Sequence, residues 1–330
     1  MGTTGVSRYT LGMCAAAALA TGCSGSQGQV SLSSLDSAQH DGTRPAALAV
    51  QERTWMQAAA KSSDLLYVSN PGNNSVTVYA YQSRKLVGTL SGFSSPAGLC
   101  ADTAGDVWIT NEGGSNVIEY AHGGTQPIKT LDDGSEQPLA CSVDETTGNL
   151  AILNADDVAV YQGASGSPKL YKGGGVYGDY GLGYGAHGDL LVDGGSYDTS
   201  NLIAFAQLPL GTTHLKQVVL SKTMQWAPPT FVQWDGQFWV VGTETLDWFK
   251  IVGKSGRFEG YSTFLPTSPI AQFWIAAIDG GSGRGNQIVV TEDDPYKVEF
   301  FQYPAGGSPF ASIIDGLSNP YGITVSKASK

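Results

Sequence analysis

The stretch SPAGLCADTAGDVWIT, from Ser95 to Thr110, recurs in altered form along the chain. Aligned on the aspartate that ends PAGLCAD, its counterparts read PLACSVD, GLGYGAH, PTFVQWD, FWIAAID and PYGITVS. The last residues of these six segments are 102, 144, 187, 235, 279 and 326, so the intervals are 42, 43, 48, 44 and 47 residues. Self-similarity at such a period is typical of solenoids and propellers.

A turn and an apolar strand follow each copy except the last. These second strands, including one that precedes the first copy, are LLYVSN from Leu65, DVWITN from Asp106, NLAILN from Asn149, DLLVDG from Asp189, QFWVVG from Gln237 and QIVVTE from Gln287. A third strand comes next, as in SVTVYAY from Ser75 and KVEFFQY from Lys297, and then a weaker fourth, as in LVGTL from Leu86. Six repeats of four strands predict an all-β fold, a six-bladed β-propeller with four-stranded antiparallel blades.

The two ends of the repeat region complement each other. The first repeat begins with its second strand, Leu65–Asn70, and the last inner strand, Tyr321–Ser326, has no second strand after it. We therefore expect these segments to pair, so that the C-terminal strand closes the ring and removes exposed edges.

The amino-acid composition agrees with short strands and tight turns, because glycine is abundant, at 44 of 330 residues, and charged residues are only 14%.

The repeat resembles that of NHL-repeat propellers, whose unit reads roughly P-x-G-I-A-V-D followed by G-x-I-Y-V-T-D. The resemblance covers about Leu65 to Lys330, and PAGLCADTAGDVWITNEGGSNVIEYA is its strongest copy. The copy at Gly181 departs from the pattern, with Gly181 in place of proline and His187 in place of aspartate. The resemblance implies the propeller fold but little about function, because propellers carry unrelated tasks.

The amino terminus, residues 1–22, is predicted to be a signal peptide. Arg8 precedes a short apolar run, LGMCAAAALA, which is too short to anchor in a bilayer. The small residues before Cys23 resemble the lipobox of bacterial lipoproteins, in which the cysteine carries the lipid. The alternative is an ordinary signal peptide cut near Ala20–Gly22. Both alternatives predict export, either lipid-anchored on the outer side of a bacterial membrane or soluble, periplasmic or secreted.

Residues 23–64 are predicted to be a flexible tether, because they are rich in serine, glycine, glutamine and alanine. Within them, Trp55 and Met56 are expected to pin the segment 53–61 against the domain. The propeller is then predicted over 65–330. The net charge of −11 gives no electrostatic reason to bind nucleic acid or an anionic membrane surface. We expect a monomer that meets a membrane only through its lipid.

Two cysteines remain after export, Cys100 and Cys141, because Cys14 lies in the removed segment and Cys23 is the predicted lipid site. They occupy the fifth and fourth positions of successive inner strands, so they project from opposite faces of neighbouring blades. The two thiols therefore either face one another or both face away. In an oxidising compartment we favour a disulfide between the second and third blades. The alternative is two buried thiols that act as small hydrophobic groups.

Enzymes of similar shape include gluconolactonase-like hydrolases and streptogramin-type lyases. The hydrolases hold a divalent metal with oxygen ligands from the starts of inner strands, but here those starts carry no Asp, Glu or Asn. The lyases use a His/Glu arrangement, whereas the four histidines of this chain fall at scattered repeat positions: His40, His122, His187 and His214. The trio Glu292–Asp294 is predicted to be a solvated turn rather than a Ca²⁺ site. No metal, cofactor or catalytic residue is predicted.

Four aromatic residues fall at or just before inner-strand starts, where propellers commonly bind ligands: Tyr180, Trp226, Trp274 and Tyr321. Aromatic rings without charge would suit a neutral ligand such as a carbohydrate or an apolar peptide. Alternatively, these rings plug the channel and pack between blades. The function predicted is a non-catalytic binding or scaffolding propeller whose ligand is an unknown protein, peptide or carbohydrate. The alternative is a hydrolase or lyase of the two types above with an atypical site.

Overall fold

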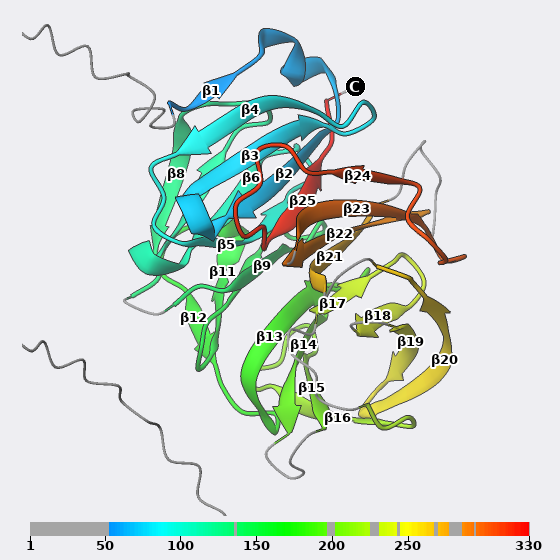
Figure 1. Cartoon of the computed structure of the whole chain (residues 1–330). Coiled ribbons are helices and arrows are strands. Elements are labelled where there is room, and N and C mark those ends of the chain that lie inside the picture. Colours follow the sequence, from blue (N-terminus) through cyan, green and yellow to red (C-terminus); the bar gives the residue numbers. More distant parts are fainter. Residues whose placement is uncertain are drawn as a thin grey trace, which may run out of the picture. The chain divides into compact units, whose positions relative to one another are not determined.

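The computed structural model describes residues 53–330, apart from 135–136, 197–201, 225–230, 243–244, 267–269, 277–285, 294 and 330. The described residues belong to one compact unit (Figure 1). The predicted signal peptide, Cys23 and the first part of the predicted tether lie outside the described residues. No helix among the described residues is long and apolar enough to cross a membrane.

Three sheets are antiparallel blades whose strands follow the chain order. The first contains β5 (Pro96–Ala101), β6 (Val107–Asn111), β7 (Asn116–Tyr120) and β8 (Pro127–Asp132). The second contains β9 (Ala140–Val143), β10 (Leu150–Leu153), β11 (Val158–Tyr161) and β12 (Lys169–Tyr171). The third contains β21 (Ile270–Ala276), β22 (Gln287–Asp293), β23 (Tyr296–Gln302) and β24 (Ala311–Ile313). The chain is therefore all-β and propeller-like, with four-stranded antiparallel blades.

A further sheet joins the two ends of the described chain. Its strand order is β1-β4-β3-β2-β25, where β1 is Trp55–Met56, β2 is Leu65–Asn70, β3 is Ser75–Ala80, β4 is Lys85–Ser91 and β25 is Ile323–Ser326. Strand β25 runs antiparallel to β2, with Leu65 opposite Ser326 and Val68 opposite Ile323. Figure 1 shows the red C-terminal strand beside the blue β2. The predicted pairing of the C-terminal strand with the first apolar strand is confirmed.

The segment before β2 packs on the outer edge of this sheet. Trp55 lies opposite Thr89 and Met56 opposite Gly88, and the 3₁₀ helix η1 (Ala58–Ser62) follows. A Cβ at Gly88 would lie 2.3 Å from the Met56 sulfur, so glycine makes room for this side chain. The compact unit therefore includes residues before Leu65. Leu65 is the residue at which the propeller was predicted to start.

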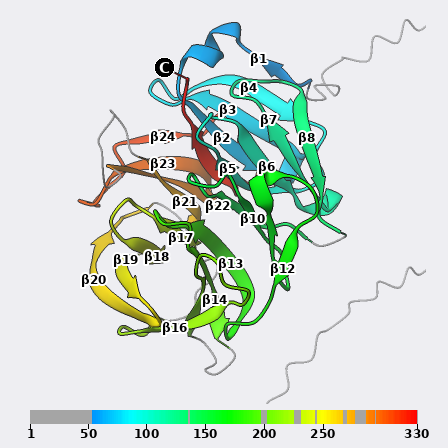
Figure 2. The same ribbon diagram turned by 180° about the vertical axis from the view of Figure 1, so that it is seen from behind.

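The largest sheet has eight strands and differs from the separate blades that the repeat predicts. Its order is β13 (Val176–Tyr184), β14 (Leu190–Ser196), β15 (Ile203–Leu208), β16 (Lys216–Leu220), β20 (Ser255–Thr263), β19 (Thr245–Val252), β18 (Trp239–Gly242) and β17 (Phe231–Trp234). Two four-stranded halves meet where β16 pairs in parallel with β20, with Leu220 opposite Gly256 (Figure 2). A Cβ at Gly256 would lie 2.6 Å from a Leu220 methyl, so the glycine permits this edge-to-edge contact.

The innermost strands surround a common centre. Strands β25, β5, β9, β13, β17 and β21 contact one another in this cyclic order. Beside the inner strand β25, alternate residues of β2 fill the spaces on its two sides: Leu65 and Tyr67 belong to one apolar cluster, and Leu66 and Val68 belong to the next. The hydrophobic core thus consists of successive layers between sheets.

The aspartates that end three of the repeat segments, Asp102, Asp144 and Asp235, hold turns. Asp102 accepts hydrogen bonds through Oδ1 from the backbone N–H groups of Ala104 and Asp106, both at 2.9 Å. Asp235 does the same with Gln237 and Phe238, at 2.8 and 2.6 Å. Such Asx turns reverse the chain into the second strand, which explains why the motif recurs.

Candidate functional site

A cavity of about 640 Å³ lies at the centre of the ring of inner strands. Its wall includes all of β9 and β17 but only the last three residues of β5 and of β13, and it continues past the carboxyl ends of these four strands into the following turns. Wall residues include Ala101, Thr103, Ser142, Tyr184, Trp234 and Trp274. The cavity therefore lies toward the carboxyl ends of the inner strands, whereas the sequence placed the ligand face at their starts.

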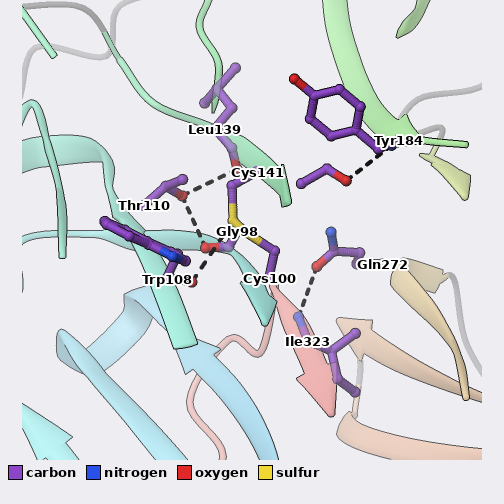
Figure 3. Close-up of a disulfide and its surroundings, with 10 residues drawn as sticks. Gly98, Cys100, Trp108, Thr110, Leu139, Cys141, Tyr184, Gln272 and Ile323 are labelled. Carbon is purple, nitrogen blue, oxygen red and sulfur yellow. Dashed lines mark hydrogen bonds between the residues drawn. A yellow bond between two sulfur atoms is a disulfide. The ribbon is translucent and has the colours of Figure 1, made fainter. Parts of the chain in front are cut away.

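A disulfide between Cys100 of β5 and Cys141 of β9 forms part of the cavity wall. The sulfurs are 2.08 Å apart and the Cα atoms 5.7 Å apart, so the two side chains face each other, the arrangement that we favoured from the sequence. Figure 3 shows the bond, with Tyr184 and Gln272 around it. The cysteines are only 2% and 7% exposed and pack with Trp108 and Leu150. The bond thus links neighbouring blades beside the cavity.

Polar side chains of the wall hold adjacent inner strands together. The Gln233 amide spans from β17 to β21, where its Oε1 accepts from the Ile275 N–H at 2.8 Å and its Nε2 donates to the Ile275 carbonyl at 3.2 Å. Gln272 Oε1 accepts from the Ile323 N–H at 2.8 Å, and Ser142 Oγ accepts from the Tyr184 N–H at 3.0 Å. These hydrogen bonds link neighbouring inner strands and so stabilise the ring.

Carboxylates surround the mouth of the cavity. Asp102, Asp144, Glu145 and Asp235 line it, with Lys327 as the basic residue among the described lining. Asp144 accepts hydrogen bonds from Thr146 N–H and the Thr147 hydroxyl, in the same turn-holding role as Asp102 and Asp235. Burial, reinforced by the nearby Asp106 carboxylate, raises the pKa of the Asp102 carboxyl. The mouth is therefore negatively charged, which the residues at the strand starts did not indicate.

Three carboxylates lie close together behind this wall. Oxygen atoms of Asp102, Asp106 and Glu119 are all within 4.8 Å of one another. Burial raises the pKa of Glu119, which pairs with Lys129 at 3.5 Å, and Asp106 accepts a 3.3 Å hydrogen bond from the His122 N–H. Each of the three carboxylates therefore has an internal partner, and we assign no ion to the cluster.

The predicted aromatic residues lie at different places. Trp274 is partly buried and lines the cavity. Tyr321 does not line it; its ring packs edge-on against Phe231, with centroids 6.1 Å apart, in an apolar cluster between blades. Only the main chain of Tyr180 is described, within β13, and Trp226 lies outside the described residues.

Two further aromatic residues of the cavity wall, Tyr184 and Trp234, were missed from the sequence. They stand at the fourth and sixth positions of their repeat segments, and Trp274 stands at the second position of its own. Because strand side chains alternate between faces, residues at even positions share a direction. This alternation is the sequence signal that identifies Tyr184 and Trp234 as candidates beside Trp274.

The histidines of the described chain do not line the cavity. His187 is exposed in a turn and His214 is also exposed, while His40 lies outside the described residues. The Nδ1 atom of His122 lies 2.6 Å from Ser326 Oγ, and its Nε2 atom lies 3.1 Å from the Ser63 carbonyl oxygen. Burial lowers the pKa of His122. His122 thus joins the chain just before β2 to the end of β25.

The prediction of a solvated turn was wrong for Glu292, while Asp294 lies outside the described residues. Glu292 is fully buried in β22 rather than solvated in a turn, because that strand continues to Asp293, which pairs with Tyr296. The Glu292 position lies opposite Ile270 on one side and Lys297 on the other. Glu292 is therefore a buried strand residue and not part of a turn.

Comparison with known proteins identifies the fold. No family model and no curated protein matches the chain. A chain in the crystal structure of a nidogen/laminin complex matches with a TM-score of 0.64 and 10% identity, over 81% of this chain and 100% of that one. The β-propeller domain of Cps50 (Swd1) from Myceliophteria thermophila matches with a TM-score of 0.52 and 10% identity, over 82% and 88%.

A protein of unknown function from Bacteroides caccae is also similar, with a TM-score of 0.57 and 8% identity, over 80% of this chain and 99% of that one. Identities this low establish shape alone, since one fold hosts many unrelated functions. Together with the sheet order, these likenesses show that the chain is a β-propeller.

Proposed function

We propose that this protein is a non-catalytic binding or scaffolding propeller that holds a ligand in its channel cavity. The observation that carries the proposal is the composition of the cavity wall. Partly exposed rings of Tyr184, Trp234 and Trp274 offer binding surface, while the Gln233 amide and the Asp102 carboxylate already hold the structure together. Concave sites with aromatic walls and a few polar groups are typical of ligand binding.

The ring is proposed to contain six blades of the NHL-repeat type. The eight-stranded sheet divides into β13–β16 and β17–β20, each of which has four consecutive antiparallel strands. Counted in this way, each of the six inner strands that touch in cyclic order belongs to one blade. The repeat intervals of the sequence support the same count.

A thermal-shift screen of the full-length exported protein tests the binding proposal, with neutral saccharides, short apolar peptides and small organic cations as probes. The variant Thr103→Trp places a large ring at an exposed wall position and should abolish the shift given by a probe that binds wild type. The matched control is Ala155→Trp, in the exposed bend between β10 and β11. Equal shifts in wild type and Thr103→Trp for every binding probe would contradict a site in the cavity.

The hydrolase or lyase alternative is tested on the same protein. Incubation with an aldonic lactone should give no hydrolysis above the uncatalysed rate. Turnover that is lost in Thr103→Trp and kept in Ala155→Trp would replace the binding proposal with an enzyme whose site is in the cavity.

Anchoring through a lipid on Cys23, on the outer side of a bacterial membrane, is part of the proposal. The support is the lipobox-like sequence before Cys23. Cell fractionation should find the wild-type protein with membranes and Cys23→Ser in the soluble fraction, because one acyl-carrying residue supplies the attachment. Cys14→Ser is the control and should stay with membranes. Membrane retention of Cys23→Ser would contradict the anchor.

A further inference from the structure

We propose that the channel cavity takes a small organic ammonium compound, that is, a positively charged nitrogen bearing apolar groups. This inference rests on the proposed function, since it names the chemical class of the ligand for the same cavity. A charged ligand differs from the neutral ligand that was predicted from the aromatic residues at the inner-strand starts. Two properties of the described wall support it, its charge and its aromatic rings.

The charge of the described wall favours a cation. Four carboxylates line the cavity and one lysine opposes them, Lys327, which is exposed. Asp144 and Asp235 are only 1% and 4% exposed. Solvent and salt therefore screen the charges of these buried carboxylates less than they screen exposed charges. Asp106 and Glu119 lie behind Asp102 and add to the same field. A concave wall with an excess of one charge concentrates ligands of the opposite charge.

The aromatic residues favour a cation with apolar groups over a bare metal ion. Tyr184, Trp234 and Trp274 come from three successive inner strands, β13, β17 and β21, and each is partly exposed at the cavity. The Trp234 ring meets Trp239 edge-on, with centroids 5.5 Å apart, which fixes its orientation. Aromatic faces attract ammonium groups through the ring quadrupole, and tryptophan does so best. Their apolar area would also bury alkyl substituents.

The wall is poorly suited to a ligand that needs many hydrogen-bond donors and acceptors from side-chain amides. Gln233 uses both ends of its amide on Ile275, and the Gln272 oxygen is taken by Ile323. Ser142 Oγ likewise accepts from the Tyr184 N–H. The rings and the exposed Glu145 carboxylate are then the principal groups for direct contact, while Asp102, Asp144 and Asp235, which also hold turns, contribute through their charge. The volume of about 640 Å³ lies within the range usual for small-molecule sites.

Calorimetric titration with choline chloride tests the proposal, against 3,3-dimethyl-1-butanol as the uncharged isostere of the same shape. Choline should bind the full-length protein roughly tenfold or more tightly than the alcohol, because only choline gains from the carboxylates and the ring quadrupoles. Choline affinity should also fall as sodium chloride is raised. Equal binding of choline and the alcohol would overturn the ammonium assignment.

Two variants separate the charge from the rings. Glu145→Gln changes an exposed wall carboxylate, and Trp274→Leu removes one ring. Each should weaken choline binding by roughly threefold to tenfold. Asp156→Asn, an equal charge change in the exposed bend between β10 and β11, is the matched control and should leave affinity unchanged. Circular dichroism verifies that the variants fold. An effect of Asp156→Asn equal to that of Glu145→Gln would overturn a local charge contribution.

Failure of this inference is distinguishable from failure of the proposed function. If choline does not bind but a neutral saccharide binds wild type and not Thr103→Trp, the ammonium class is wrong and the binding function stands. If no probe of any class shows binding that depends on Thr103, both the inference and the binding function in this cavity are overturned.

Discussion

At Gly98 the main chain of β5 passes directly against β9. The Gly98 N–H donates to the Leu139 carbonyl at 2.8 Å, and a Cβ there would lie 2.6 Å from Ala140 Cα. The same third position of the last repeat segment is Gly322, where a Cβ would lie 2.0 Å from the Ala97 carbonyl oxygen. Glycine in the P-x-G motif therefore lets adjacent inner strands approach each other.

Gly98→Ala should destabilise the protein by about 1–3 kcal/mol, because the added methyl group meets backbone that cannot move aside easily. Urea unfolding measures the loss. Amide exchange at residue 98 should quicken in Gly98→Ala. Unchanged stability in this variant would contradict the close approach.

Buried tyrosines give the fold an alkaline limit. Burial raises the pKa values of Tyr67 and Tyr79 to about 12. Between pH 10 and 12 these tyrosines ionise in the unfolded chain but stay neutral in the native protein, so the unfolded state binds fewer protons. The free energy of unfolding should therefore be full below pH 10 and fall above it, by up to about 1.4 kcal/mol per pH unit for each tyrosine.

Tyr79→Phe should reduce this slope, because it removes one of the titrating groups. Urea unfolding at several pH values above 10 measures the slope, and the exposed Tyr296→Phe controls for loss of a hydroxyl. A slope identical in wild type and Tyr79→Phe would show that Tyr79 is not protected in the native state.

At the scale of elements, β25 carries the closure of the ring. It pairs with β2, and its Ile323 and Val325 are buried with Leu66 and Val68 in one cluster. Deleting residues 321–330 should unfold the domain, because it opens strand edges and exposes core. Deleting only 329–330, beyond the strand, is the control. Thermal unfolding by circular dichroism measures both, and an unchanged midpoint for the longer deletion would contradict the closure.

The disulfide is a second link between elements. It joins β5 to β9 across a sequence separation of 41 residues. The double variant Cys100→Ala, Cys141→Ala should lose up to about 4 kcal/mol by the chain-entropy account. Mass spectrometry of denatured, alkylated protein, purified after export without reductant, should find neither cysteine modified. Two alkylated thiols would contradict the bond.

The pairing of strands was predictable from the sequence where the repeat pattern left only one possible partner. Leu65–Asn70 and Tyr321–Ser326 pair as expected, because an incomplete first repeat and a surplus last strand leave one solution. The parallel contact of β16 with β20 was not predictable, since it depends on Gly256 meeting Leu220 at an outer edge, where the repeat carries little pattern. The carboxylates of the cavity mouth were not predictable as ligand-facing groups, because Asp102 holds a turn and also lines the mouth.

At the scale of the whole molecule, the candidate site exists only in the closed ring. Its three partly exposed rings, Tyr184, Trp234 and Trp274, come from different inner strands, and the Ile323 N–H of the closing strand holds Gln272 beside them. No pair of neighbouring blades could form the cavity alone. Ligand binding and ring closure should therefore be lost together. The tryptophans of the cavity wall should report ligand binding directly.

The most direct measurement is an NMR titration of the indole N–H groups of the seven tryptophans with choline. Trp234 and Trp274 should shift progressively and saturably, because they line the cavity, while Trp55, on the outer strand β1, should stay in place. Thr103→Trp should suppress the shifts. Saturable shifts at Trp55 without shifts at Trp234 and Trp274, or no shift at any indole, would contradict a ligand site in the channel cavity.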